Sequence, residues 1–144
     1  MKISTKGRYG LRAVIDLVLH SNGEHVSLIN IAERQDISKN YLEQVFSTLR
    51  KAGIVKSVKG AQGGYVLAKK ASSIFVGDIL RALEGNLSVV GEGTQIETNR
   101  IEKCIKKNIW DKIDQQINIV IDNMSLEDLI NEYKKDKESL MYFI

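Results

Sequence analysis

The sequence predicts a mostly α-helical protein that carries one small β-hairpin. Apolar residues recur every three or four positions through most of the chain, and this helical period gives way to β-branched and aromatic residues only between Ile54 and Ala68. Within that stretch, the loop Gly60–Gly64 contains three glycines, as expected between the two strands of a hairpin. With no proline in the chain, the breaks between elements are predicted from glycines and from the period alone.

Three helices are predicted before the hairpin, and each follows a serine that can cap it. Ser4 precedes a helix that runs to about His20, Ser27 precedes a short helix, and Ser38 precedes a helix that runs to about Ala52. The first helix is expected to end at Asn22-Gly23 and the third at Gly53, where residues tolerate positive φ, and the second is expected to break at Asp36-Ile37-Ser38.

The chain after the hairpin is predicted to be helical again. One helix spans about 76–83 and ends at Gly85, and a long helix spans about 99–123. Ser125 with Asp128 resembles a capping box that starts a last short helix.

Charge is distributed unevenly along the chain. Residues 1–85 contain 13 Lys and Arg against 7 Asp and Glu, whereas residues 86–144 contain 8 against 11, within a total net charge of +3. A basic first half favours a polyanion as its partner, although a chance fluctuation in a solvated surface gives the same count.

Several classes of protein are not indicated by the sequence. No apolar run reaches the roughly 18 residues that cross a membrane, and the segment Met1–Ser4 lacks the apolar core of a secretory signal. The single cysteine, Cys104, cannot form an internal disulfide, so we expect a cytoplasmic protein without membrane contact. No phosphate-binding glycine loop precedes a helix and no metal-ligand spacing occurs, so neither an enzyme nor a metal site is predicted.

Helix, short break, helix and hairpin, in that order, are typical of a winged helix-turn-helix that binds duplex DNA. The helix after Ser38 would enter the major groove, where amides such as those of Asn40 and Gln44 can pair with adenine and Glu43 can accept from cytosine. The hairpin, or wing, combines lysines with glycines that let the backbone approach phosphates. The predicted DNA-binding residues are Ser38, Lys39, Asn40, Tyr41, Glu43, Gln44, Arg50, Lys51, Lys59, Gly60, Gly63 and Gly64. The alternatives are an amphipathic helix with a solvated polar face, a plain hairpin turn, or a winged helix used only for protein contacts.

The long helix carries an apolar stripe that a single small domain cannot cover. About 25 residues span roughly 37 Å, whereas a domain of 85 residues has a radius of gyration of about 12 Å. We therefore expect a homodimer, with a DNA-binding domain over residues 1–85 and a loop, dimerisation helix, short helix and tail over 86–144. The predicted dimerisation residues are Ile101, Ile105, Ile109, Trp110, Ile113, Ile117 and Val120.

Residues 1–85 closely resemble winged-helix regulators of the Rrf2 type. The matching segments keep their order and spacing: KGRYGL (6–11), IAE (31–33), YLEQ (41–44), LRKAG (49–53), KGAQGGY (59–65) and DILRALEG (78–85). The resemblance implies a dimeric transcription regulator whose long C-terminal helix pairs the subunits, so we expect an imperfect palindrome as the DNA site.

Many members of this family bind an iron–sulfur cluster through three closely spaced cysteines after the Glu-Gly that ends the fourth helix. Here the stretch 86–103 contains no cysteine, and one thiolate cannot hold a cluster that normally requires four ligands. The sequence is therefore interpreted as a member that needs no cofactor. Redox sensing through Cys104 remains an alternative.

Both ends of the chain, 1–11 and 141–144, resemble those of a cluster-free repressor of cysteine metabolism within the family. That resemblance implies a protein partner, the cysteine synthase O-acetylserine thiol-lyase. Tyr142, Phe143 and Ile144 follow a charged stretch, and Ile144 offers an apolar side chain with a carboxylate to a pocket made for an amino acid. We expect this tail either to dock in the active site of that enzyme or to fold back on the body.

Overall fold

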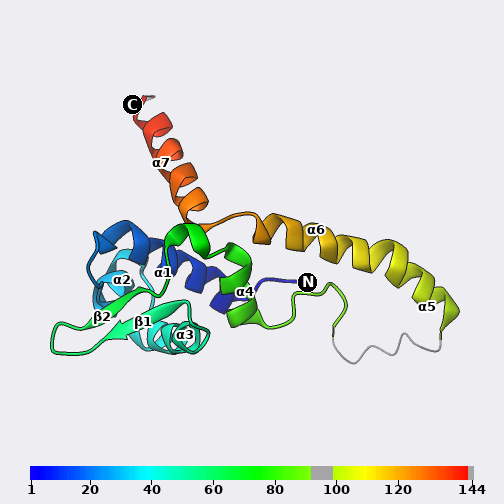
Figure 1. The fold of residues 1–144 in the computed structure, drawn as a ribbon, viewed down its shortest axis with the longest axis horizontal. Helices are drawn as coiled ribbons and strands as arrows, with labels where there is room; N and C mark the ends of the chain where they lie inside the picture. The colour runs from blue at the N-terminus through cyan, green and yellow to red at the C-terminus, as the bar shows by residue number, and fades with distance from the viewer. Residues whose placement is uncertain (92–98, 143–144) are drawn as a thin grey trace.

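The computed structural model describes residues 1–91 and 99–142 (Figure 1). The elements before the hairpin are α1 (Thr5–Ser21), α2 (Leu28–Gln35) and α3 (Lys39–Lys51), and the hairpin consists of β1 (Val55–Val58) and β2 (Gly64–Leu67). After it come a 3-10 turn η1 (Ala71–Ser73), α4 (Val76–Glu84), α5 (Arg100–Ile105), η2 (Lys106–Trp110), α6 (Asp111–Asp122) and α7 (Leu126–Tyr142). This order confirms the predicted fold class, mostly helical with one antiparallel hairpin.

The first three helices begin at the serines that the sequence predicts. The hydroxyls of Ser4, Ser27 and Ser38 each accept a hydrogen bond from the backbone N–H three residues later, which supplies one of the partners that the first turn lacks. Asn22 and Asp36 end α1 and α2 in the left-handed conformation, with φ of 42° and 52°. Local polar residues thus fix the short turn that orients α3 relative to α2.

The hairpin pairs Val55 with Leu67 at its base and Val58 with Gly64 near its tip. A third segment joins it, because Val26 and Tyr65 exchange two backbone hydrogen bonds of 2.9 Å. The wing is therefore attached to the turn between α1 and α2 as well as to the end of α3.

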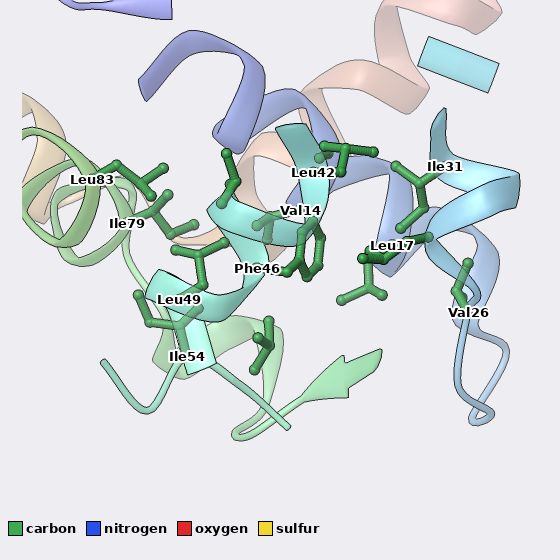
Figure 2. Packing of buried hydrophobic residues seen from close by; sticks show 14 of the residues in the cluster. Val14, Leu17, Val26, Ile31, Leu42, Phe46, Leu49, Ile54, Ile79 and Leu83 are labelled. Carbon is green, nitrogen blue, oxygen red and sulfur yellow. The ribbon is translucent and has the colours of Figure 1, made fainter. Parts of the chain in front are cut away.

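The main core lies where α1, α2, α3 and α4 meet (Figure 2). Leu17, Phe46 and Leu49 are completely buried in it. Leu126, from the first turn of α7, is also completely buried in this cluster, so the start of α7 packs as part of the body.

The predicted long helix runs from Arg100 to Asp122 and extends away from the body (Figure 1). It is not a uniform α-helix, because its middle, η2, is a π-helical turn. We call α5, η2 and α6 together the arm. Its base is held by α4, where Arg81 donates to Asp122 at 2.6 Å and to Asn118 at 2.9 Å.

The last helix, α7, is longer than the short helix predicted after Ser125. The capping box itself is present, since Asp128 N–H donates to Ser125 Oγ at 3.0 Å and Ser125 N–H donates to Asp128 Oδ2 at 3.1 Å. The helix then continues through the charged stretch 134–138 and projects from the body (Figure 1). None of the helices in the described ranges is both long and apolar enough to span a bilayer.

Candidate nucleic-acid interface

Helix α3 presents one face to the core and the other to solvent. Leu42, Val45, Phe46 and Leu49 are buried at helical spacing. On the opposite face Lys39, Asn40, Glu43, Gln44, Arg50 and Lys51 are exposed. Every polar residue predicted to read or anchor DNA from inside this helix is therefore accessible. Ser38 also serves as the N-cap, and Tyr41 is half-buried.

A groove of about 580 Å³ separates α3 from the wing. Of the predicted DNA-binding residues, it is lined by Lys39, Glu43, Arg50, Lys59, Gly60, Gly63 and Gly64. Ser38, Asn40, Tyr41, Gln44 and Lys51 do not line this groove. The groove places three cations beside a glycine-containing backbone, which is the chemistry that contacts phosphates.

Sequence reasoning missed part of this groove. Ser27 and Ile29, at the start of α2, also line it, and so does Ser57 of β1. Ile29 is half-exposed, with 49% of its surface accessible. An isolated apolar residue on a helix surface is ordinary in a sequence, so no signal there could have identified it.

Glu43 has a local partner that the sequence did not reveal. Its carboxylate lies 3.7 Å from the ammonium group of Lys39, one turn earlier on α3, and both side chains are about half exposed. An exposed pair of this kind contributes little free energy, so Glu43 is free to exchange Lys39 for a base-edge donor.

The wing is held against α3 by packing and by a close backbone approach. The rings of Phe46 and Tyr65 are in tilted contact, with centroids 5.0 Å apart and an interplanar angle of 56°, which joins the buried face of α3 to β2. A Cβ on Gly64 would lie 2.3 Å from the carbonyl oxygen of Val26, so only glycine fits there. Gly60 has φ of 125°, which a residue with a side chain rarely adopts. These two glycines thus have a structural role in addition to the predicted contact with DNA.

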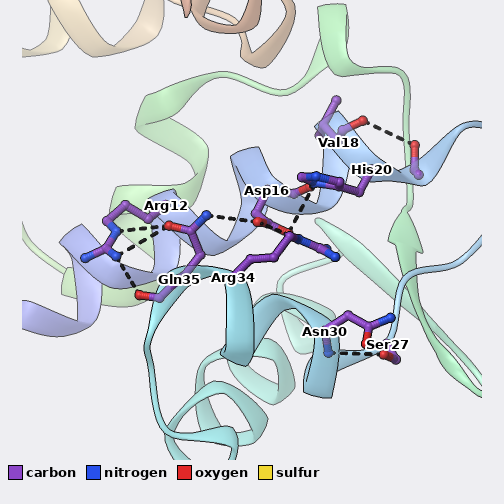
Figure 3. A network of polar contacts seen from close by, with 9 residues as sticks. Arg12, Asp16, Val18, His20, Ser27, Asn30, Arg34 and Gln35 are labelled. Carbon is purple, nitrogen blue, oxygen red and sulfur yellow. Dashed lines mark hydrogen bonds and ion pairs between the residues drawn. The ribbon is translucent and has the colours of Figure 1, made fainter.

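A network of polar contacts between α1 and α2, the helix that precedes α3, was not predicted (Figure 3). Asp16, on α1, is almost fully buried and accepts hydrogen bonds from Arg34 and Gln35 of α2. Burial raises the pKa of Asp16, but the hydrogen bonds from Arg34 and Gln35 and the charge of Arg34 outweigh it and hold the pKa below its ordinary value. The sequence did contain a signal for this network, because Asp16 is a lone aspartate between apolar residues of a helix and would need polar partners if buried.

The residues predicted for dimerisation lie along the arm. Ile101 (72% accessible), Ile109 (48%) and Val120 (68%) are exposed, and so is Ile113, whereas Ile105, Trp110 and Ile117 are half-buried. Of the residues predicted for partner docking, Tyr142 is exposed at the end of α7, while Phe143 and Ile144 lie outside the described residues.

The donor set does not fit the iron–sulfur cluster that the resemblance implies for many family members. Cys104 is the sole cysteine of the sequence and lies exposed on α5. His20 and His25 contact the carbonyls of Asp16 and Gln62, remote in sequence from α5. Across residues 1–91 and 99–142, no three His, Cys, Asp or Glu side chains gather as a metal site.

The chain is similar to known transcription regulators over its whole length. A family model described as "Rrf2: Iron-dependent Transcriptional regulator" matches residues 3–132. The regulator CymR of Bacillus subtilis is 42% identical over 144 residues, which cover both chains completely, and the regulator IscR of Yersinia enterocolitica is 38% identical over 91% of this chain and 80% of its own. The solved structure of CymR, titled the global cysteine regulator of B. subtilis, superposes with a TM-score of 0.79 over 92% of this chain and 98% of that one. These relatives are regulators and not enzymes, as the sequence predicts, and the chain belongs to the Rrf2 family of winged-helix, DNA-binding transcription regulators.

Proposed function

We propose that this protein is a dimeric, sequence-specific repressor of cysteine and sulfur metabolism genes that works without an iron–sulfur cluster. The observation that carries the proposal is the groove between α3 and the wing, lined by Lys39, Arg50 and Lys59. In the proposed complex, α3 lies in the major groove of the DNA and the wing lies along the neighbouring phosphates.

Base reading is assigned to the exposed amides of α3 and anchoring to its cations and those of the wing. Asn40 and Gln44 lie one turn apart on the accessible face, which suits paired hydrogen bonds with adenine. When the ion pair between Glu43 and Lys39 opens, the Glu43 carboxylate accepts a hydrogen bond from a cytosine amino group. Arg50, Lys51 and Lys59 neutralise phosphates and fix the register.

Dimerisation is assigned to the apolar face of the arm. Exposure of these isoleucines to water is unfavourable in free energy, and packing against the arm of a second subunit would bury them. The face continues at the arm's base into an apolar pocket lined by Met1, Ile3, Leu80, Leu87, Ile117 and Val120. Four of these six residues were not predicted from the sequence. A two-fold dimer presents two copies of α3 to an imperfect palindrome, with half-sites about 34–36 Å apart.

The test is to measure the mass of the purified protein by light scattering and to recover the genomic fragments that it binds. We expect a dimer at micromolar concentration and an imperfect palindrome in fragments upstream of sulfur-metabolism genes. A monomer, or binding that is indifferent to sequence, would overturn the DNA-binding scheme, whereas a palindrome near unrelated genes would overturn only the metabolic role.

The proposed signal arrives through a protein partner, O-acetylserine thiol-lyase. The relative named the global cysteine regulator supports the metabolic link. Helix α7 projects from the body (Figure 1), and its last residues Leu140, Met141 and Tyr142 are exposed. The segment 142–144 is proposed to enter the enzyme's active site, so that O-acetylserine competes with it. For regulation, the complex must bind DNA more tightly than the free dimer.

Calorimetry with the enzyme tests this docking. Removal of residues 142–144 should abolish the binding heat and leave DNA binding by the free dimer unchanged. Lys137→Ala, on the same helix, is the matched control and should bind the enzyme normally. Equal affinity of the truncated and full-length proteins for the enzyme would end the docking proposal.

A further inference from the structure

The tip of the wing, residues 59–63, carries the proposed phosphate contact of Lys59 but has little packing of its own. Residues 59–62 are exposed, and Gly63 is half-buried. The loop closes on itself through the hydrogen bond from Gly63 N–H to the carbonyl of Gly60, at 3.0 Å. Glycines lose more conformational freedom on ordering than other residues, so a tip that became ordered only on contact with DNA would weaken binding. A contact that orders the tip beforehand removes that cost.

Two attachments hold the root of the wing. The ring of Phe46 packs on Tyr65, and Val26 exchanges backbone hydrogen bonds with the same residue of β2. The tip has a different attachment. Among the hydrogen bonds of residues 1–91 and 99–142, the one that joins loop 59–63 to a segment outside the hairpin comes from His25, whose Nε2 contacts the carbonyl of Gln62.

His25 lies on a stretch of backbone that is held on both sides. Before it, Asn22 ends α1 in the left-handed conformation, and Glu24 N–H donates to the carbonyl of Ser21 at 2.6 Å. After it, Val26 is buried and makes its two hydrogen bonds of 2.9 Å with Tyr65. The imidazole therefore extends from a fixed point of the body toward the tip.

The acceptor determines the protonation of the imidazole. A backbone carbonyl only accepts hydrogen bonds, so Nε2 of His25 carries the hydrogen and donates it to Gln62. Protonation of Nδ1 leaves Nε2–H in place, so the neutral ring in this tautomer and the charged ring both make the contact. The contact thus suits a constant structural link.

His25 acts from outside the groove that receives DNA. Lys59, Gly60, Ala61 and Gly63 of the tip line the groove between α3 and the wing, whereas His25 and Gln62 do not. The hydrogen bond therefore holds the tip from behind and leaves the groove free for the phosphates.

We propose that His25 is a positioning residue for DNA binding, which orders the wing tip before the protein meets its operator. The imidazole holds the Gln62 carbonyl, and the loop then presents Lys59 and the backbone of Gly60 to the phosphates. This inference rests on the proposed function, because it assumes that the groove beside α3 binds duplex DNA. It adds a residue that affects affinity without touching the DNA.

Three variants of His25 test the proposal in the full-length protein. The amide nitrogen of glutamine lies as many bonds from Cα as Nε2 of histidine, whereas that of asparagine corresponds to Nδ1. His25→Gln therefore retains a donor that reaches Gln62, and His25→Asn is the matched control whose donor is too short. His25→Ala removes the donor altogether.

Affinity for the palindromic operator is the first measurement. Loss of one hydrogen bond should weaken each wing about threefold, so a dimer with two wings should bind about tenfold more weakly in His25→Ala and His25→Asn. His25→Gln should bind within about twofold of the wild type. An affinity of His25→Gln as low as that of His25→Ala would show that the donor is not what matters and would overturn the proposal.

The order of the tip and the stability of the fold are the second measurement. Nitrogen-15 relaxation of the free protein should show more mobile Gly60 and Gly63 amides in His25→Ala and His25→Asn than in His25→Gln and the wild type. The urea midpoint should stay the same in all four proteins, because the root of the wing remains attached through Val26 and Tyr65. A midpoint that falls together with the affinity, while the tip amides keep their mobility, would mean that His25 supports the fold and does not position the tip.

A double mutant identifies the group through which His25 acts. In a Lys59→Ala background, His25→Ala should weaken operator binding less than it does in the wild type, because the tip has already lost its cation. Fully additive effects would overturn the link between His25 and the phosphate contact of Lys59. If the wild type binds DNA and all three His25 variants bind equally well, this inference fails and the proposed function stands. If the wild type itself binds no duplex DNA, both fail.

Discussion

The buried carboxylate of Asp16 and the partly exposed guanidinium of Arg34 form an ion pair, with Arg34 Nη2 donating to Asp16 Oδ1 at 2.7 Å. The Asp16 side chain is 1% exposed, and Gln35 Nε2 donates to its other oxygen at 2.9 Å. This pair fixes α2 against α1, and Figure 3 shows that the contacts continue through Gln35 to Arg12. Because α2 leads directly into the turn before α3, the pair determines the geometry of the helix-turn-helix.

We expect Asp16→Ala to lower the free energy of unfolding by about 1–3 kcal/mol, because the hydrogen bonds from Arg34 and Gln35 to the buried carboxylate are lost while Arg34 can still be solvated. Chemical denaturation measures this loss. Lys135→Ala breaks the exposed pair with Glu132 and should cost less than about 1 kcal/mol. Equal costs for the two variants would contradict a structural role for Asp16.

The same carboxylate should make stability depend on pH in the acid range. The pKa of Asp16 is lowered in the folded protein, so its contribution is fully present above the unfolded pKa, about 3.9, and is lost as pH falls through the folded pKa. The difference in unfolding free energy between the wild type and Asp16→Asn should therefore shrink as pH falls from about 5 toward 2. A difference that stays constant over this range would show that the charge of Asp16 does not contribute.

The N-terminal elements could be predicted because local residues determine them. Three serine caps and two residues with positive φ set the ends of α1, α2 and α3 without help from distant parts of the chain. The exposed face of α3 followed from its period alone. The groove beside it could not be predicted, since its width depends on contacts such as Phe46 with Tyr65 that join distant segments.

The spacing of the isoleucines in the arm contains a signal for the π-helical turn that was not used in the sequence analysis. Its isoleucines recur every four residues from Ile101 to Ile121, and each such step exceeds a full α-helical turn by about 40°. A stripe of this spacing drifts around a regular helix. The π-helical turn 106–110 takes up one extra residue and rotates the stripe back, so the strict spacing of four was itself a signal for it.

The last helix was predicted too short because its exposed half has no apolar period. Residues 134–138 are all charged, which resembles a solvated tail. They continue a helix that begins in the core at Leu126 and Ile130, so nucleation by packing precedes the charged turn. Lys135 with Glu132 adds a local pair of the kind that supports an exposed helix.

Base reading and anchoring should separate by mutation. Gln44→Ala should weaken binding to the preferred site by about 1–3 kcal/mol and relax discrimination, because an exposed amide of α3 is lost. Lys59→Ala should weaken specific and random DNA alike and reduce the salt dependence by about one unit, because it removes a phosphate contact at the wing. Titrations at several salt concentrations measure both effects. Identical changes for the two variants on both kinds of DNA would refute this division.

The protein should bind its operator without an iron–sulfur cluster, because Cys104 alone cannot supply the ligands of one. Protein purified under strictly anaerobic conditions should be colourless, and an iron chelator should leave its affinity for the operator unchanged. Cys104→Ser should bind with the same affinity, which separates this expectation from redox sensing. A stoichiometric iron–sulfur chromophore would contradict it.

The attachment of the wing can be tested at Gly64. A Cβ there would lie 2.3 Å from the carbonyl oxygen of Val26, which accepts the hydrogen bond from Tyr65 N–H. The backbone of either segment must move, so Gly64→Ala should lower the free energy of unfolding by about 1–3 kcal/mol. It should also weaken binding to all DNA sequences, because the wing carries the phosphate contacts of Lys59.

Gly91→Ala is the matched control, since nothing lies within 4 Å of a Cβ at that position. If Gly64→Ala unfolds and binds DNA as the wild type does, the bridge between Val26 and Tyr65 does not hold the wing in its DNA-binding position.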